Sequence, residues 1–406
     1  MAKTAKRDLT RQQQLARGPV DLPFLALVLL LLGIGLVMLL SASSYAASIE
    51  RVPANYDALY YFKRQAAFAV MGLVAMYFAS KFDYQLWRGL SPFVIFGAIL
   101  LLIAVHIPGL SHTAGGATRW LKLGPITFQP SEFAKLGVVL FFSATLCKRD
   151  QGPKKLKGRY REPIQSLRRF YYWSDLNDLV GPLIVLAIIT VLMLMQPHLS
   201  GTILIFAAAA AIFFAAGIKL FWFVVGGGLG AVGVWFILVV IGYNGARIQT
   251  WKDPWWDPLD KSMQVLQSIL AVASGGLSGL GLGESRQKYS YLPEEQNDFI
   301  FAIVCEELGF IGATLIIILF ALLIVRGYWL ALHARDRFGS MVVIGINTLM
   351  AVQVFLNMAV VTNLIPATGV SLPFFSYGGT ALMIQLAEMG IILSVSRQIP
   401  APPQEE

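Results

Sequence analysis

The chain has 406 residues, of which 56% are hydrophobic and only 14% are charged, and its formal net charge at pH 7 is +9. In soluble domains roughly a quarter of the residues are charged, so this composition excludes an ordinary soluble protein and predicts a polytopic membrane protein. The basic residues gather in segments that flank apolar runs, which indicates contact with anionic lipid and excludes nucleic acid as a partner.

Apolar runs follow one another along the chain, most of them long enough to cross a bilayer. The first ends in small residues that resemble a signal-peptide cleavage site, but it is long enough to span and many runs follow, so we expect it to be retained. We predict an all-α polytopic membrane protein with ten transmembrane helices in a single membrane domain, residues 22–396. The runs are 22–40, 65–80, 92–107, 129–147, 179–195, 201–217, 220–242, 299–325, 341–364 and 377–395.

Ten spans place both termini on the same side of the membrane, and the basic residues indicate which side it is. With the N-terminus inside, about two thirds of the 32 Lys and Arg residues lie in inner segments. We therefore predict that the tails 1–21 and 397–406 are cytoplasmic. The loop 148–177, which is the most basic inner segment, is predicted to be cytoplasmic as well and to lie near anionic lipid.

The same topology predicts one long extracytoplasmic loop, 244–298, between the seventh and eighth helices, far longer than a simple connection. Tryptophans and prolines in 251–258 are typical of a stiff segment at the headgroup level. Apolar residues at helical spacing in 263–270 predict a half-buried interfacial helix. Glycines crowd in 275–283, and because their spacing matches no known phosphate-binding motif, we favour a flexible turn over a phosphate-binding loop.

Asp298 stands where this loop meets the eighth apolar run. A carboxylate in that setting has water on one side and hydrocarbon on the other, which can raise its pKa and keep it available as a base. The alternative is a helix cap, because Asp at a helix N-terminus accepts backbone N–H bonds and interacts favourably with the helix dipole. Position alone leaves both roles open.

Several charged and polar residues fall inside the apolar runs. Glu132 and Lys135 are three residues apart, so they share a helix face, and we expect them to pair and to line an outward-open cavity. For Glu306, two turns beyond Asp298, we expect no more than a supporting role. We interpret the amides at this depth as polar contacts between helices: Asn347, Gln353, Asn357 and Gln385.

Six blocks occur in order along the chain, at 117–124, 128–135, 196–202, 291–301, 306–309 and 369–379. Together they resemble the FtsW/RodA/SpoVE (SEDS) family of peptidoglycan glycosyltransferases over residues 22–396. The Trp-rich outer loop and the basic tail favour an FtsW-like or SpoVE-like member. The resemblance implies an enzyme that polymerises lipid II into glycan strands at the outer face of the plasma membrane, during division or cell-shape growth.

The resemblance also implies the site residues. Asp298 matches the essential acidic residue of the family's long outer loop and is the expected catalytic residue. The residues expected to bind substrate are Arg119, Trp120, Glu132, Lys135, Gln196 and Ser376. Two positions depart from the family pattern. His198 stands where the family has an acidic residue, and Thr368 stands where some members have Lys.

The implied chemistry is an inversion, because the donor sugar is α-linked to a lipid pyrophosphate and the product is β-linked. One base must remove the proton of the acceptor hydroxyl opposite the leaving group. Asp298 fits this role, or that of a ligand to an activating metal ion. The pyrophosphate needs cations, which Arg119, Lys135 or a divalent ion such as Mg²⁺ or Mn²⁺ would supply. The four histidines show no metal-ligand spacing.

The resemblance implies a multi-pass protein of the bacterial plasma membrane, located at the division septum. Its expected partners are lipid II (the undecaprenyl-pyrophosphate-linked disaccharide peptide), a class B penicillin-binding protein, and other divisome or elongasome membrane proteins. Two other functions stay open. A lipid II flippase would depend most on Glu132, Lys135 and Glu388 at membrane depth, whereas a non-catalytic division scaffold would tolerate changes at all of these and at Asp298.

Overall fold

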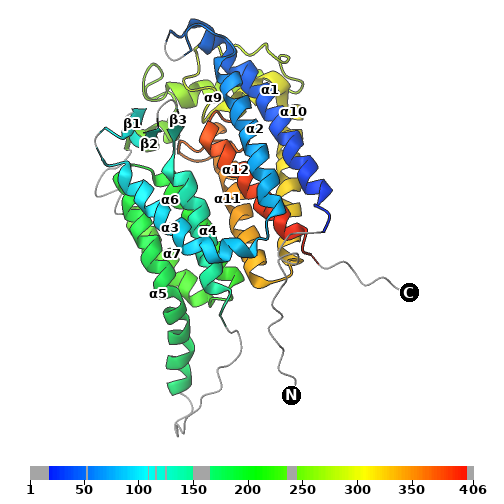
Figure 1. The fold of residues 1–406 in the computed structure, drawn as a ribbon. Coiled ribbons are helices and arrows are strands. Elements are labelled where there is room, and N and C mark those ends of the chain that lie inside the picture. Colours follow the sequence, from blue (N-terminus) through cyan, green and yellow to red (C-terminus); the bar gives the residue numbers. More distant parts are fainter. Residues whose placement is uncertain are drawn as a thin grey trace.

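The computed structural model describes residues 18–51, 54–107, 109–114, 117–123, 126–149, 165–235 and 245–399. These residues form a bundle of long helices with a small sheet and two short helices at one end (Figure 1). The helices are α1 (Leu22–Ile49), α2 (Tyr60–Lys81), α3 (Gln85–Ala104), α4 (Pro130–Leu146), α5 (Gln165–Met195), α6 (Leu199–Ala215), α7 (Leu220–Trp235), α8 (Gly245–Lys252), α9 (Met263–Ser274), α10 (Ile300–Leu332), α11 (Arg337–Val361) and α12 (Gly379–Ser396). The strands are β1 (Ser111–Ala114), β2 (Ala117–Leu123) and β3 (Ile126–Phe128).

Each of the ten predicted apolar runs coincides with one of the long helices. Six helical segments are both long and apolar enough to cross a membrane, in α1, α3, α5, α10, α11 and α12. Among the others, α4 and α6 have only 17 residues each, and α2 carries three basic residues. A multi-pass membrane protein is therefore supported, while the number of ten spans stays a prediction.

Parts of four predicted segments lie outside the described residues. They are most of the two tails, the middle of the loop 148–177, and the end of the seventh run beyond Trp235. Within the outer loop, α9 confirms that 263–270 is helical, and α8 precedes it.

The prediction of an all-α protein is wrong for residues 111–114, 117–123 and 126–128, which form a three-stranded antiparallel sheet in the order β1-β2-β3. The sequence contains turn signals between the strands, Gly115-Gly116 and Gly124-Pro125. The strands are short and lie between long apolar runs, so the sequence predicted only helices here. The strand β2 carries Arg119, one of the residues expected to bind substrate.

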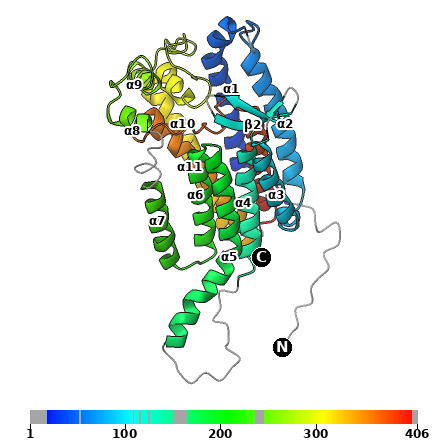
Figure 2. The same cartoon turned by 90° about the vertical axis from the view of Figure 1, so that its left-hand side faces the viewer.

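The ends of the described chain meet at one end of the bundle. The Gly18 N–H donates to the Arg397 carbonyl oxygen (3.1 Å), and the Arg397 guanidinium donates back to the Gly18 carbonyl oxygen (2.9 Å). Arg326 Nε, near the end of α10, donates to the Asp21 carboxylate beside them (3.0 Å). Because α10 runs from the far end to this one, Asp298 and the segment 245–299 lie at the opposite end from the termini (Figures 1 and 2).

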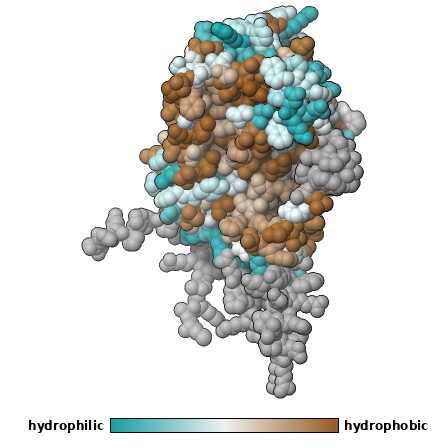
Figure 3. Space-filling view, turned by 180° about the vertical axis from the view of Figure 1, so that it is seen from behind, coloured by the Kyte–Doolittle hydropathy of each residue, from teal (hydrophilic) through white to brown (hydrophobic). Residues whose placement is uncertain are grey.

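The middle of the bundle presents an apolar surface. In Figure 3, hydrophobic side chains cover the middle of the visible face, and hydrophilic ones gather towards its upper end. Large side chains such as Phe93 of α3 and Phe310 of α10 are well exposed, at 74% and 65%. An apolar surface of this extent suits hydrocarbon and not water, which supports insertion in a bilayer.

The glycine-rich segment 275–283 docks onto a break in α10. Gly309 interrupts the helix with φ 67° and ψ −169°. The Gly281 N–H donates to the Glu307 carbonyl oxygen (3.0 Å) at this break. A Cβ on Gly279, where φ is +80°, would lie 2.1 Å from the same oxygen, so glycine is required for the approach. The turn that we expected to be flexible is therefore a packed connection.

Candidate active site

Asp298 lies two residues before α10 and is partly buried. The N-cap position of this helix belongs to Phe299, and no side chain of the described residues caps it. The capping role left open by the sequence is therefore not supported. The carboxylate instead lies beside the connection between α11 and α12, because a Cβ on Gly369 would be 3.2 Å from Asp298 Oδ2.

The surroundings of Asp298 raise the pKa of its carboxyl group. Burial raises the pKa of Asp298 to about 6, and the negative charge of Glu294 acts in the same direction. The positive charges of Arg119 and Arg247 hold this pKa down. A carboxylate with a pKa of about 6 is mostly ionised at pH 7 and is a stronger base than an ordinary Asp.

Arg119 is brought from β2 to the connection between α5 and α6. Its Nε donates to the Gln196 carbonyl oxygen (3.3 Å), and its Nη2 donates to the Pro197 carbonyl oxygen. The Gln196 side chain donates to the Leu102 carbonyl oxygen at the end of α3 (3.0 Å). Two of the predicted substrate-binding residues are thus in contact, but Gln196 uses its backbone towards Arg119 and its side chain towards α3.

Trp120 follows Arg119 in β2 and pairs across the sheet with His112. Arg119 lies at a bulge of β2, between the pairs His112–Trp120 and Thr113–Thr118, so the usual alternation of side chains between the two faces does not apply to it. Its indole is partly exposed. A place for Trp120 in the substrate site stays a prediction.

His198, the first departure from the family pattern, is buried at the N-cap of α6. Burial, together with the positive charges of Arg119 and Lys135, lowers the pKa of His198 to about 3. The imidazole is therefore neutral at physiological pH. It cannot replace the negative charge of the acidic residue that relatives are expected to have at this position.

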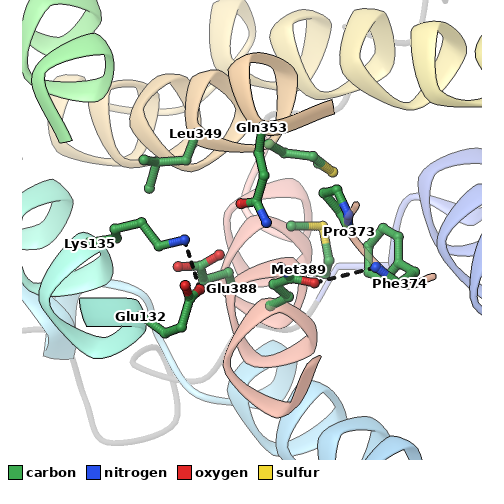
Figure 4. Close-up of a pocket in the computed structure, with 10 residues that line it drawn as sticks. Glu132, Lys135, Leu349, Gln353, Pro373, Phe374, Glu388 and Met389 are labelled. Carbon is green, nitrogen blue, oxygen red and sulfur yellow. Dashed lines mark hydrogen bonds and ion pairs between the residues drawn. The ribbon is translucent and has the colours of Figure 1, made fainter. Parts of the chain in front are cut away.

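Glu132 and Lys135 form the predicted ion pair, with 2.7 Å between Glu132 Oε2 and Lys135 Nζ, and both are buried. They line a pocket together with Glu388 of α12 and Gln353 of α11 (Figure 4). The pairing is confirmed, while the outward opening of the pocket and its contact with substrate stay predictions. Glu388 was not among the expected substrate-binding residues, although its charge within an apolar run marked it as unusual.

Ser376 lies in the connection between α11 and α12 and is buried. Its hydroxyl accepts a hydrogen bond from the Leu372 N–H (2.7 Å), and its carbonyl oxygen accepts one from Gln65 Nε2 of α2 (3.1 Å). These contacts fix the connection internally. A direct contact of the Ser376 hydroxyl with substrate stays a prediction.

Arg247 is a site residue that the sequence analysis missed. It lies in α8, and its Nη1 donates to the Ala367 carbonyl oxygen (3.3 Å). This bond brings a cation beside Thr368, the second departure from the family pattern. The only signal in the sequence was a basic residue in an outer segment.

Glu306 and Glu307 of α10 accept hydrogen bonds from neighbouring segments. Glu306 accepts hydrogen bonds from the Ser285 hydroxyl and the Arg286 N–H (3.2 Å). Glu307 accepts one from the Ser41 hydroxyl of α1 (2.6 Å). The bonds to Glu306 hold the loop that leads to Asp298, and the bond to Glu307 joins α10 to α1. The supporting role expected for Glu306 is therefore a structural one.

Within the described ranges, no three His, Cys, Asp or Glu side chains come together as metal ligands. Of the charged groups that act on Asp298, only Glu294 could serve as a metal ligand, because the guanidinium groups of Arg119 and Arg247 have no acceptor atom.

The comparisons with known proteins agree with the resemblance. A protein family described as "Cell cycle protein" (FtsW/RodA/SpoVE) matches residues 22–400. The chain is 40% identical over 378 residues to stage V sporulation protein E of Bacillus subtilis (strain 168), with 93% of this chain and 97% of that protein covered. It is 36% identical over 380 residues to a protein of Geobacter sp. (strain M18) named "Probable peptidoglycan glycosyltransferase FtsW", with the same shares covered.

Two solved structures share the fold. One is a chain of a peptidoglycan synthase complex studied for its coordination of polymerization and crosslinking. It has a TM-score of 0.71 and 26% identity, with 93% of this chain and 98% of that chain covered. The other is the rod shape-determining protein RodA of Thermus thermophilus, with a TM-score of 0.63, 24% identity, and 94% and 98% covered. At this identity, the second likeness shows the fold alone.

Proposed function

The chain belongs to the FtsW/RodA/SpoVE family, and we propose from this membership and from the site that it is a peptidoglycan glycosyltransferase that polymerises lipid II. The observation that carries the proposal is Asp298. Its carboxylate lies at the end of the bundle opposite to the termini, it does not cap α10, and its pKa of about 6 suits a general base.

The reaction proceeds by inversion at the donor sugar. Asp298 removes the proton of the acceptor hydroxyl, and the oxygen attacks the anomeric carbon of the donor. The bond from this carbon to the lipid pyrophosphate breaks, and its electron pair leaves with the pyrophosphate. The proton stays on Asp298 until it is released to water. Both substrates are lipid-linked, so confinement to one membrane supplies much of the required proximity.

The leaving pyrophosphate requires positive charge, which Arg119 and Arg247 supply near Asp298. Lys135 is less suited to this role, because Glu132 offsets its charge at 2.7 Å and Glu388 lines the same pocket. The pocket has room for about one water molecule, which is too little for a sugar. We therefore assign the pyrophosphate to the arginines, and a contact of Glu132 and Lys135 with the substrate stays a prediction.

The orientation, the partner and the location belong to the same proposal. One membrane domain, 22–396, crosses the bilayer ten times, and the termini and 148–177 are cytoplasmic, so Asp298 faces outside. A class B penicillin-binding protein is the partner, supported by the similarity to a chain of a complex that polymerizes and crosslinks. The names of the relatives, in sporulation and division, support a place at the septum.

A lipid II flippase is the second candidate, and the buried Glu132–Lys135 pair beside Glu388 favours it. The two functions differ in the residue on which they depend. Purified protein with its penicillin-binding protein partner is given labelled lipid II, and the glycan product is measured for the wild type and Asp298→Asn. A polymerase makes glycan only with Asp298 intact. A flippase makes no glycan in either case.

A further inference from the structure

The buried side-chain amide of Asn357 joins Asp298 to the connection between α11 and α12, which the Asp298 carboxylate faces. Asn357, on α11, is fully buried. Its Nδ2 donates to the Asp298 carbonyl oxygen (2.7 Å) and to the Val370 carbonyl oxygen (2.7 Å). An amide nitrogen carries two hydrogens, so each carbonyl oxygen receives one.

The second carbonyl belongs to the residue next to Gly369, whose Cα faces the Asp298 carboxylate. Gly369 has φ +72°, and a Cβ there would be 3.2 Å from Asp298 Oδ2. The distance between the carboxylate and this backbone therefore depends on how the two segments are held together. Asn357 binds both of them from a third element, α11, which packs against α10, α6 and α4.

This role differs from the one that the sequence suggested. We interpreted the amides at membrane depth as contacts between helices, and Asn347 fits that description, because its Nδ2 donates to the Ile324 carbonyl oxygen of α10 (2.9 Å). Asn357 instead binds two non-helical segments, and one of them carries the proposed base. Asp298 has no regular secondary structure of its own to hold it.

We infer that Asn357 is a positioning residue of the glycosyl transfer, which holds the Asp298 backbone at a fixed distance from residues 369–370 so that the carboxylate meets the acceptor hydroxyl. The inference rests on the proposed function. Without this amide, the segment before α10 is free to shift relative to the connection, and a displacement of about 1 Å at a reacting group can cost about a hundredfold in rate.

The chain offers a matched control. Asn347 lies on the same helix and is fully buried, and its Oδ1, like that of Asn357, has no partner among the described residues. Asn357→Ala and Asn347→Ala therefore remove the same buried group from the same helix, with the loss of two hydrogen bonds for Asn357 and one for Asn347. Both variants are purified with the partner penicillin-binding protein, and kcat and KM for lipid II and the thermal unfolding midpoint are measured.

We expect a larger decrease in the unfolding midpoint for Asn357→Ala, because it leaves two carbonyl oxygens without their donor and Asn347→Ala leaves one. Only Asn357→Ala should lose kcat, by about a hundredfold, with KM for lipid II little changed. If Asn357→Ala does not fold, Asn357→Ser keeps one hydroxyl donor and should show a smaller loss of kcat than Asp298→Asn. Equal kcat for the Asn347 variant and either Asn357 variant would overturn the inference.

The same measurements test the proposed function separately from the role of Asn357. A wild-type protein that makes no glycan overturns the proposed function. An active wild type, an inactive Asp298→Asn and a fully active Asn357→Ala would leave the proposed function intact and overturn the role of Asn357 alone.

Discussion

At the scale of single residues, the proposed role of Asp298 depends on how its pKa is set. Burial and Glu294 raise it to about 6, and two arginines oppose them. The carboxylate must be ionised to accept a proton. We therefore predict that kcat/KM for lipid II falls as the pH is lowered through about 6, and a pH–rate profile of the purified complex measures this.

The same balance predicts the effect of Arg247→Met. Removing this cation should raise the pKa of Asp298 further, because a positive charge that favours the carboxylate is lost. The acid limb of the kcat/KM profile should move to higher pH. A profile that keeps its acid limb and loses rate equally at every pH would show that Arg247 acts on the substrate and not on the base.

Asp298 also affects stability. Its pKa in the folded protein is raised above the ordinary value of 3.8, so folding favours the protonated form. The ionised carboxylate therefore lowers the free energy of unfolding progressively as the pH rises from about 4 to about 6. Asp298→Asn should unfold at a higher temperature than the wild type at pH 7, with a smaller difference near pH 4. A capping role would give the opposite result at pH 7.

The buried pair of α4 gives a further prediction. Lys135→Met leaves Glu132 unpaired beside Glu388, and removing one partner of a buried pair typically costs about 3–5 kcal/mol. The double variant Glu132→Gln/Lys135→Met should lose less stability than this single variant. Thermal unfolding in detergent compares them. If neither variant changes the unfolding midpoint, the ion pair contributes nothing measurable to the free energy of unfolding, as expected for a solvated pair.

At the scale of elements, the apolar runs were sufficient to predict the long helices, and the spacing of Glu132 and Lys135 was sufficient to predict their pairing. Contacts between distant segments could not be predicted. Arg119 donates to the carbonyl oxygen of a residue 77 positions away, and Asn357 donates to that of a residue 59 positions away. No side-chain pattern marks a backbone acceptor. The strands of residues 111–128 were missed although glycines marked their turns.

The docking of 275–283 onto α10 gives the prediction at this scale. Gly279→Ala places a Cβ about 2 Å from the Glu307 carbonyl oxygen, whereas Gly283→Ala meets nothing within 4 Å. Both glycines have positive φ, at +80° and +84°, so the backbone strain is similar. The Gly279 variant should therefore show the larger decrease in unfolding temperature. Equal decreases would show that the loop does not depend on close packing at the break.

At the scale of the whole molecule, the orientation in the membrane decides whether Asp298 meets an external substrate. Cysteines at the exposed positions Asp260 and Arg335 lie at opposite ends of the bundle. In a background without Cys147 and Cys305, we predict that a membrane-impermeant thiol reagent labels Asp260→Cys in intact cells and labels Arg335→Cys only after lysis. The reverse pattern would place Asp298 on the cytoplasmic side.

The most direct measurement is polymerisation of labelled lipid II by the purified protein with its penicillin-binding protein partner, for the wild type and Asp298→Asn. The variant keeps the size of the side chain and removes its charge. We predict that it folds, binds the partner and loses glycan synthesis by a factor of about a hundred or more. An Asp298→Asn protein that makes glycan at a rate near that of the wild type would contradict the assignment of Asp298 as the catalytic base.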